Sequence, residues 1–233
     1  MALNIAHSAA APKRQQLPEE AASYVRELII SGDVKAGDYL RIERIAEAIG
    51  VSNTPVREGL LSLSSQGFVR LVPRRGFVVA SFSEQDIHDL FWAQARLGGE
   101  LAARATKNIS PQSVERLEEL NAQYTEAVEA DEADAVAHLG HLFHREINLA
   151  AGSYRLALLL GSIVRHLPNR FYAGIEGQVD ATQDDHPQLL TAIRNGDARN
   201  ARSVMEQHIL NGADALIETL RERGVWDSQD ASA

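Results

Sequence analysis

The apolar and polar positions between residues 40 and 65 predict two short helices joined by a tight turn. In the first helix, apolar residues recur at i, i+3, i+4 and i+7 and form one face: Ile42, Ile45, Ala46 and Ile49. Gly50 follows, and glycine most readily takes the left-handed conformation that ends a helix. The pattern therefore predicts a helix that ends at about residue 49.

A second helix should begin three or four residues later. Ser52 or Thr54 can cap it, and Pro55 is tolerated in a first helical turn. A turn of this length is the helix-turn-helix connection, and it places Asn53, Thr54 and Arg57 at the leading end of the second helix, where a recognition helix meets base edges and phosphates.

Two β-type runs follow, at residues 68–72 and 76–80, and 73–75 joins them as a hairpin with a basic tip. A helix-turn-helix followed by such a hairpin is a winged helix, whose wing would place Arg74 and Arg75 beside the phosphate backbone or in a minor groove. Alternatively, the hairpin tip is only a soluble turn and the helix pair only core packing; the order of the two elements argues against this reading.

The chain here resembles the GntR family of bacterial transcription regulators, over about residues 17–80. The resemblance rests on the sequences at 29–40, 52–60 and 71–79. It implies a dimer that binds a short palindromic operator in double-stranded DNA. In that family the position of Asn53 is usually occupied by arginine, so the resemblance does not predict the operator sequence. An asparagine side chain can pair with adenine if it reaches a base. The expected DNA-binding residues are Arg41, Arg44, Ser52, Asn53, Thr54, Arg57, Arg74, Arg75 and Gly76.

Length and charge indicate two domains. The chain has 233 residues, 45% of them hydrophobic, and no cysteine, which excludes disulfides and thiolate metal sites. Residues 1–80 carry ten basic and eight acidic residues, a net of +2, whereas residues 81–233 carry 13 and 24, a net of −11. DNA binding is therefore expected of the N-terminal part alone. We find no signal peptide and no apolar run of membrane-spanning length, so we expect a cytoplasmic protein.

The second half reads as helix throughout. Helical stripes and breaks predict helices at 83–106, 111–130, 133–150, 154–173, 183–194 and 198–223, which form an antiparallel bundle. The expected fold class is thus mainly α, with an N-terminal winged helix-turn-helix, a small β-hairpin wing and a C-terminal helical bundle. The expected boundaries are a flexible tail at 1–16 that can reach DNA, the DNA-binding domain at 17–80, the effector-binding and dimerisation domain at 81–225 and a tail at 226–233.

Three histidines of the bundle, His144, His186 and His208, lie on or beside apolar helix faces. A single inward histidine is usually a hydrogen-bonded core residue, but three on three late helices suggest one metal site, because neutral imidazoles bind Zn²⁺ and similar ions. The sequences at 143–147, 185–197 and 201–209 resemble the FCD ligand-binding domain of one GntR subfamily. In that domain the three matching histidines hold a divalent metal together with an acidic or amide residue one turn before the first. Here that position is Gly140, flanked by His138 and His141.

The resemblance also implies a carboxylate effector held by Arg96, the first residue of an Arg-x-x-x-Glu pattern that ends at Glu100. The alternative is a surface ion pair between these two side chains. Arg165 is a second effector-binding candidate, and a solvated position is equally compatible with its sequence. Gly98 and Gly99 interrupt the same helix and would allow close helix packing or approach of a ligand.

We therefore expect a dimeric regulator, a repressor rather than an enzyme, that responds to a small organic acid at a divalent metal such as Zn, Ni or Mn. Two alternatives remain open. In one, the metal itself is the signal. In the other, the histidines serve a metal-dependent helical enzyme, although the chain has no Ser/His/Asp set, His-Glu-x-x-His helix or phosphate loop, and a winged helix has no role in such an enzyme.

Overall fold

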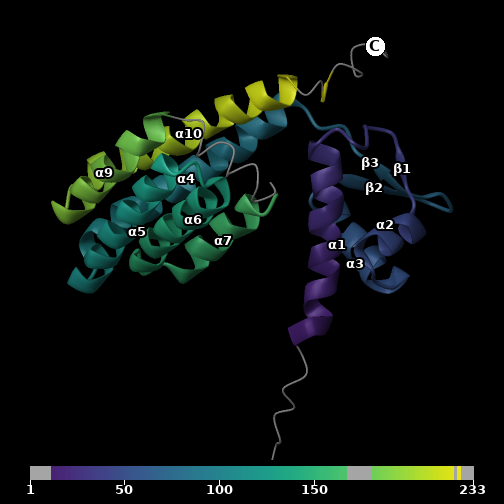
Figure 1. Cartoon of the computed structure of the whole chain (residues 1–233), viewed down its shortest axis with the longest axis horizontal. Coiled ribbons are helices and arrows are strands. Elements are labelled where there is room, and N and C mark those ends of the chain that lie inside the picture. Colours follow the sequence, from purple (N-terminus) through teal and green to yellow (C-terminus); the bar gives the residue numbers. More distant parts are fainter. Residues whose placement is uncertain (1–11, 167–179, 223–224, 227–233) are drawn as a thin grey trace, which may run out of the picture. The chain divides into compact units, whose positions relative to one another are not determined.

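The computed structural model describes residues 12–166, 180–222 and 225–226 and divides them into two compact units (Figure 1). The first unit holds the residues up to Phe82 together with Val225 and Trp226, and the second spans Ser83–Glu222. None of the described helices combines the length and apolar character that crossing a bilayer requires.

The first unit is a winged helix. Helix α1 (Pro12–Ile30) packs on α3 (Asn53–Ser65). A turn of three residues joins α2 (Ile42–Ile49) to α3. Gly50 ends α2 in the left-handed conformation with φ of 71°, and the amide of Val51 donates to the carbonyl of Ala46. Ile45 and Ala46 are buried. The predicted stripe, stop signal and turn are thereby confirmed.

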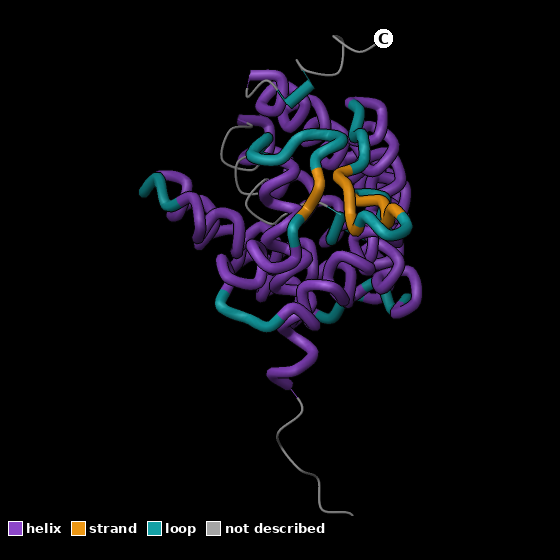
Figure 2. The backbone as a smooth tube through the Cα atoms, turned by 90° about the vertical axis from the view of Figure 1, so that its right-hand side faces the viewer, coloured by secondary structure: helices purple, strands orange, loops and turns teal. Residues whose placement is uncertain are grey.

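A three-stranded antiparallel sheet in the order β1-β3-β2 completes this unit; its strands are orange in Figure 2. Strands β2 (Val69–Val72) and β3 (Gly76–Val79) form the predicted hairpin, and β1 (Tyr39–Leu40), which the sequence did not predict, pairs with β3. Phe77, Val78 and Val79 of the central strand are buried, so the sheet forms part of the core of this unit.

The second unit is built from six helices among the described residues: α4 (Glu84–Asn108), α5 (Pro111–Glu129), α6 (Ala133–Ala150), α7 (Tyr154–Val164), α9 (Asp180–Arg194) and α10 (Ala198–Glu222). Ser83 caps α4 in a capping box with Asp86, and Ser110 caps α5 before Pro111. One apolar cluster draws residues from α4, α5, α6, α9 and α10, so these helices share a core.

Helices α4 and α10 run antiparallel and form the most extensive helix pair, the teal and yellow ribbons side by side in Figure 1. Arg221 near the end of α10 pairs with Glu84 at the start of α4. Between the two helices, a Cβ added to Gly98 would lie 2.7 Å from the Ile209 Cδ1 atom, and one added to Gly99 would lie 2.6 Å from the Glu206 Cγ atom. Of the two roles expected for these glycines, the observed one is close helix packing.

Some boundaries differ from those expected. Helix α1 begins at Pro12, inside the segment 1–16 that the sequence assigns to a flexible tail, and residues 1–11 lie outside the described residues. Trp226, which was placed in a C-terminal tail, donates its indole N–H to the carbonyl of Phe82 at 2.6 Å. The predicted helix at 154–173 is observed to Val164, and residues 167–173 are outside the described part.

Candidate DNA interface and candidate metal centre

Helix α3 presents a polar face to solvent. Its inner face is buried against the rest of the first unit, through Pro55, Val56, Gly59, Leu60 and Leu63. Asn53, Thr54 and Arg57 are exposed, as the spacing predicts. Ser52 occupies the N-cap position, but its side chain makes no capping hydrogen bond, and Thr54 lies inside the helix, so neither predicted cap forms. An end without a side-chain cap leaves first-turn N–H groups accessible to an acceptor such as a phosphate oxygen.

Cations on neighbouring elements extend this surface. Arg41 and Arg44, at the start of α2, are exposed, as are Arg74 and Arg75 at the tip of the wing. Arg74 has a φ of 62°, and Gly76, two residues later, has a φ of 94°, so the chain turns sharply between β2 and β3. The side chains predicted to meet DNA are thus all exposed, and half-buried Gly76 belongs to the turn itself.

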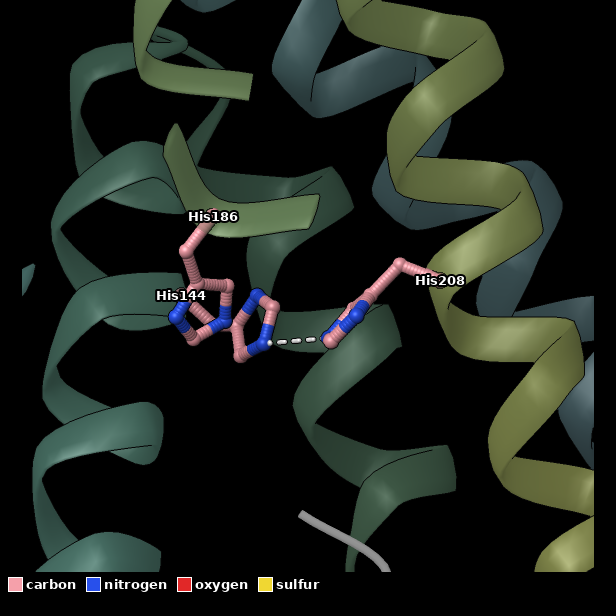
Figure 3. Close-up of side chains that lie close together, drawn as sticks. All are labelled: His144, His186 and His208. Atoms are coloured by element: carbon pink, nitrogen blue, oxygen red, sulfur yellow. Dashed lines mark hydrogen bonds between the residues drawn. The ribbon is translucent and has the colours of Figure 1, made fainter. Parts of the chain in front are cut away.

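The three predicted histidines converge in the second unit. His144 comes from α6, His186 from α9 and His208 from α10, and one ligand nitrogen from each lies within 4.8 Å of the other two (Figure 3). The Nε2 atoms of His144 and His208 are 3.1 Å apart. Their separation along the chain is 64 residues, so only the folding of the bundle brings them together.

His186 lies deepest in this cluster, with 1% of its surface exposed. Its ring stacks on Phe143 with centroids 4.3 Å apart and faces Tyr124 at 4.9 Å. Neither of its ring nitrogens has a hydrogen-bond partner among the described residues. A buried polar group without a partner is costly, because it gives up its hydrogen bonds to water.

The same burial keeps two of the histidines, His144 and His186, neutral. Burial lowers the pKa of His186 well below the usual 6.5, and His144 and His208 lower it further. Burial likewise lowers the pKa of His144 well below that value, with contributions from His208 and His141. At neutral pH both imidazoles are therefore in the neutral form, which has one nitrogen lone pair and binds metals.

A divalent metal fits this donor set. Metal–nitrogen bonds of about 2.0–2.1 Å place the nitrogens of a tetrahedral site about 3.3–3.4 Å apart, and the ligand nitrogens here already lie within 4.8 Å of one another. One of the two unpartnered nitrogens of His186 would gain a bond. Three imidazoles suit divalent ions such as zinc, nickel and manganese.

The surroundings of His144 agree with the sequence analysis. Gly140, one turn earlier, is buried, so a side chain at this position would face the interior. His138 and His141 are exposed and do not belong to the metal-capable cluster that the described residues form.

The two arginines expected to bind an effector lie at the surface. The Arg96 side chain is 51% exposed, not buried, and pairs with Glu206 of α10 instead of Glu100. Glu100 pairs with Arg104 and Arg202. Arg165 is exposed at the end of α7. Arg96 thus forms a surface ion pair with a partner other than Glu100, and effector binding by Arg96 or Arg165 stays a prediction.

Two residues without an assigned role in the sequence analysis emerge from the structure. The Asp185 Oδ2 atom lies 3.3 Å from the Nδ1 atom of His208; the only signal in the sequence is that this aspartate directly precedes His186. Arg70 is exposed on β2 and adds a cation to the wing; alternation along the strand, with buried Val69 beside it, could have indicated this.

An exposed polar helix beside a basic wing, joined to a helical unit with its own polar site, is the arrangement of a DNA-binding transcriptional regulator. Comparison with protein families agrees: residues 17–79 match the model of the bacterial regulatory proteins of the gntR family, and residues 89–211 match that of the FCD domain. The chain belongs to the GntR family, and its helical unit is an FCD domain.

Similar proteins include regulators from Escherichia coli (strain K12). The chain is 24% identical over 218 residues to the Exu regulon transcriptional regulator, which covers 84% of this chain and 83% of that protein. It is 26% identical over 192 residues to the HTH-type transcriptional repressor GlaR, with 78% and 87% covered. Among solved structures, E. coli McbR/YncC has a similar fold, with a TM-score of 0.66 and 21% sequence identity; the match covers 87% of this chain and 98% of that chain.

Proposed function

We propose that this protein is a cytoplasmic repressor that binds a palindromic operator as a homodimer. We further propose that a small carboxylate effector binds at a divalent metal held by His144, His186 and His208. The observation that carries the metal site is buried His186, whose two ring nitrogens have no hydrogen-bond partner among the described residues.

Operator binding is assigned to the leading end of α3 and to the wing. Arg57, Thr54 and Asn53 are exposed on one side of α3 and can reach base edges in the major groove. The cations of α2 and of the wing tip would bind phosphates, which positions the helix without reading sequence.

In the helical unit, the histidines bind the metal and the neighbouring aromatic rings exclude water from one side of it. A bound divalent metal supplies a positive charge and open coordination positions that carboxylate oxygens can occupy. Phe143 and Tyr124 hold the His186 ring in place from two sides. Effector binding would then shift the population between dimer arrangements that differ in operator affinity.

The homodimer is supported by apolar side chains exposed around the turn from α6 to α7: Leu149, Tyr154, Leu158 and Leu159, each more than half exposed. Exposed apolar clusters of this kind often mark interfaces, and a second copy would cover this one. Light scattering should give a dimer for the wild type and a smaller mass for Leu158→Asp. Unchanged mass would remove α7 from the interface.

A second candidate is a regulator whose signal is the metal itself. The exposure of Arg96 and Arg165 favours it, because neither arginine offers a buried fork to a carboxylate in this conformation.

Operator binding distinguishes the two candidates. DNA fragments would be selected from a randomised pool by the wild-type protein, and affinity measured with chelator, with Zn²⁺ alone and with Zn²⁺ plus a panel of carboxylates. A change in operator affinity that requires a carboxylate supports the first candidate. A change in operator affinity with Zn²⁺ alone supports the second. His186→Ala should abolish the response, whereas the exposed His138→Ala should retain it. Equal metal content in both variants would refute the site.

A further inference from the structure

Asp185 contacts one of the proposed metal ligands from outside the cluster. Its Oδ2 atom lies 3.3 Å from the Nδ1 atom of His208, while the Nε2 atom of the same ring lies 3.1 Å from the Nε2 atom of His144. The two nitrogens of His208 therefore face different partners, a carboxylate on one side and a second histidine on the other. Figure 3 shows the contact between His208 and His144 as a dashed line.

The position of Asp185 is that of a supporting group. Among the residues that the structure describes, the metal-capable set comprises His144, His186 and His208 and leaves Asp185 out. The contact is also well shielded, because the side chains of His208 and Asp185 are only 9% and 18% exposed. A hydrogen bond in such surroundings competes with little water and fixes ring orientation.

A neutral imidazole carries one N–H donor and one acceptor nitrogen, and an ionised carboxylate can only accept. The contact with Asp185 is therefore satisfied when Nδ1 of His208 carries the proton and donates, and in that tautomer the lone pair lies on Nε2, the nitrogen that faces His144. The other tautomer would set an acceptor against the carboxylate and place a proton where a metal must bind.

We infer that Asp185 is a positioning residue of the metal centre, which holds His208 in the tautomer and orientation that present Nε2 to the metal. This inference rests on the proposed function of the histidine cluster. Asp185 also brings a negative charge close to a site that has Gly140 where an acidic ligand could stand. Adjacent residues of α9 thus act differently: His186 binds directly, and Asp185 orients a ligand from α10.

The test measures Zn²⁺ affinity by competition with a chromophoric chelator in the full-length protein. Loss of such a supporting partner typically weakens metal binding about 10- to 100-fold, and we expect this for Asp185→Ala. Asp185→Asn keeps an oxygen acceptor but loses the charge, so its Zn²⁺ affinity should decrease less than that of Asp185→Ala. Asp214→Asn removes an exposed carboxylate from α10 and should bind Zn²⁺ as the wild type does.

A second measurement separates orientation from general damage. In the metal-free protein, ¹⁵N resonances of the His208 ring should show Nδ1 protonated and Nε2 unprotonated in the wild type and in Asp185→Asn, and a mixture in Asp185→Ala. Wild-type Zn²⁺ affinity in Asp185→Ala, or an unchanged tautomer in it, would overturn the inference. A wild-type protein that binds no Zn²⁺ would instead refute the proposed metal site. If Asp185→Ala fails to fold, Asp185→Asn decides. Wild-type Zn²⁺ affinity in Asp185→Asn, with the His208 tautomer unchanged, supports a role in orientation to which the charge does not contribute. A mixture of His208 tautomers in Asp185→Asn overturns the inference.

Discussion

Acid should destabilise the metal-free helical unit through His144 and His186. In the folded state both pKa values lie well below 6.5, mainly because the rings are buried. In the unfolded chain they return to about 6.5. Between the folded and unfolded pKa values the unfolded chain binds more protons than the native one, so the free energy of unfolding decreases as the pH falls below about 6.5.

The size of the effect follows from the number of histidines. Each group contributes about 1.4 kcal/mol for each pH unit below its unfolded pKa, as long as it stays neutral in the native state. Two such groups lower the free energy of unfolding by about 2–3 kcal/mol between pH 7 and pH 5.5. For a unit of this size that corresponds to a decrease in Tm of about 6–12 °C.

Carboxylates also titrate in this range, so the measurement is a difference between variants. Thermal melts in excess chelator would compare the wild type with His186→Phe, in which a phenyl ring takes the place stacked on Phe143. About half of the histidine contribution should disappear in that variant. His138→Gln changes an exposed residue and should keep the wild-type slope. Equal slopes in wild type and His186→Phe would refute the assignment of acid sensitivity to these buried rings.

Three further outcomes are expected. Arg57→Ala should weaken operator binding by about 1–3 kcal/mol, and Arg75→Ala should weaken binding to all sequences alike and flatten the salt dependence; wild-type gel shifts for both would contradict the docking surface. Gly140→Asp should tighten Zn²⁺ binding in calorimetry, because it adds an inward carboxylate one turn before His144; unchanged affinity would mean that position 140 does not face the site. Gly59→Ala should destabilise the DNA-binding unit by about 1–3 kcal/mol although alanine favours helix, because its Cβ would lie 2.6 Å from a backbone carbonyl of α1. Gly161 has room for a Cβ, so Gly161→Ala should leave the stability unchanged or raise it. A loss of stability in both variants, or in neither, would contradict this steric argument.

The winged helix was predictable because its signals are local. The stripe of α2, the stop at Gly50 and the hairpin at 73–75 all lie within 40 residues, and each has a simple steric or hydrophobic cause. The short strand β1 escaped prediction because two residues carry no periodicity. Its existence depends on pairing with β3, a partner some 38 residues away.

The metal site was predictable in composition but not in geometry. Apolar stripes show that the histidines face inward, and the family resemblance selects the three that converge. The sequence does not give the partner of Arg96, because Glu206 lies 110 residues away and on another helix. The role of Asp185 depends equally on a contact across 23 residues, between two helices whose rotation the sequence leaves open.

The glycines of α4 have a mechanical consequence. With Gly98 and Gly99 set against the side chains of Ile209 and Glu206, α10 packs directly on the backbone of α4, and sliding one helix along the other would drive these side chains against α4 residues that carry a Cβ. Any displacement of His208 should therefore carry α4 with it. Since Ser83, the N-cap of α4, directly follows Phe82, the last residue of the first unit, such a displacement would be passed on at the start of α4, where the chain enters the first unit.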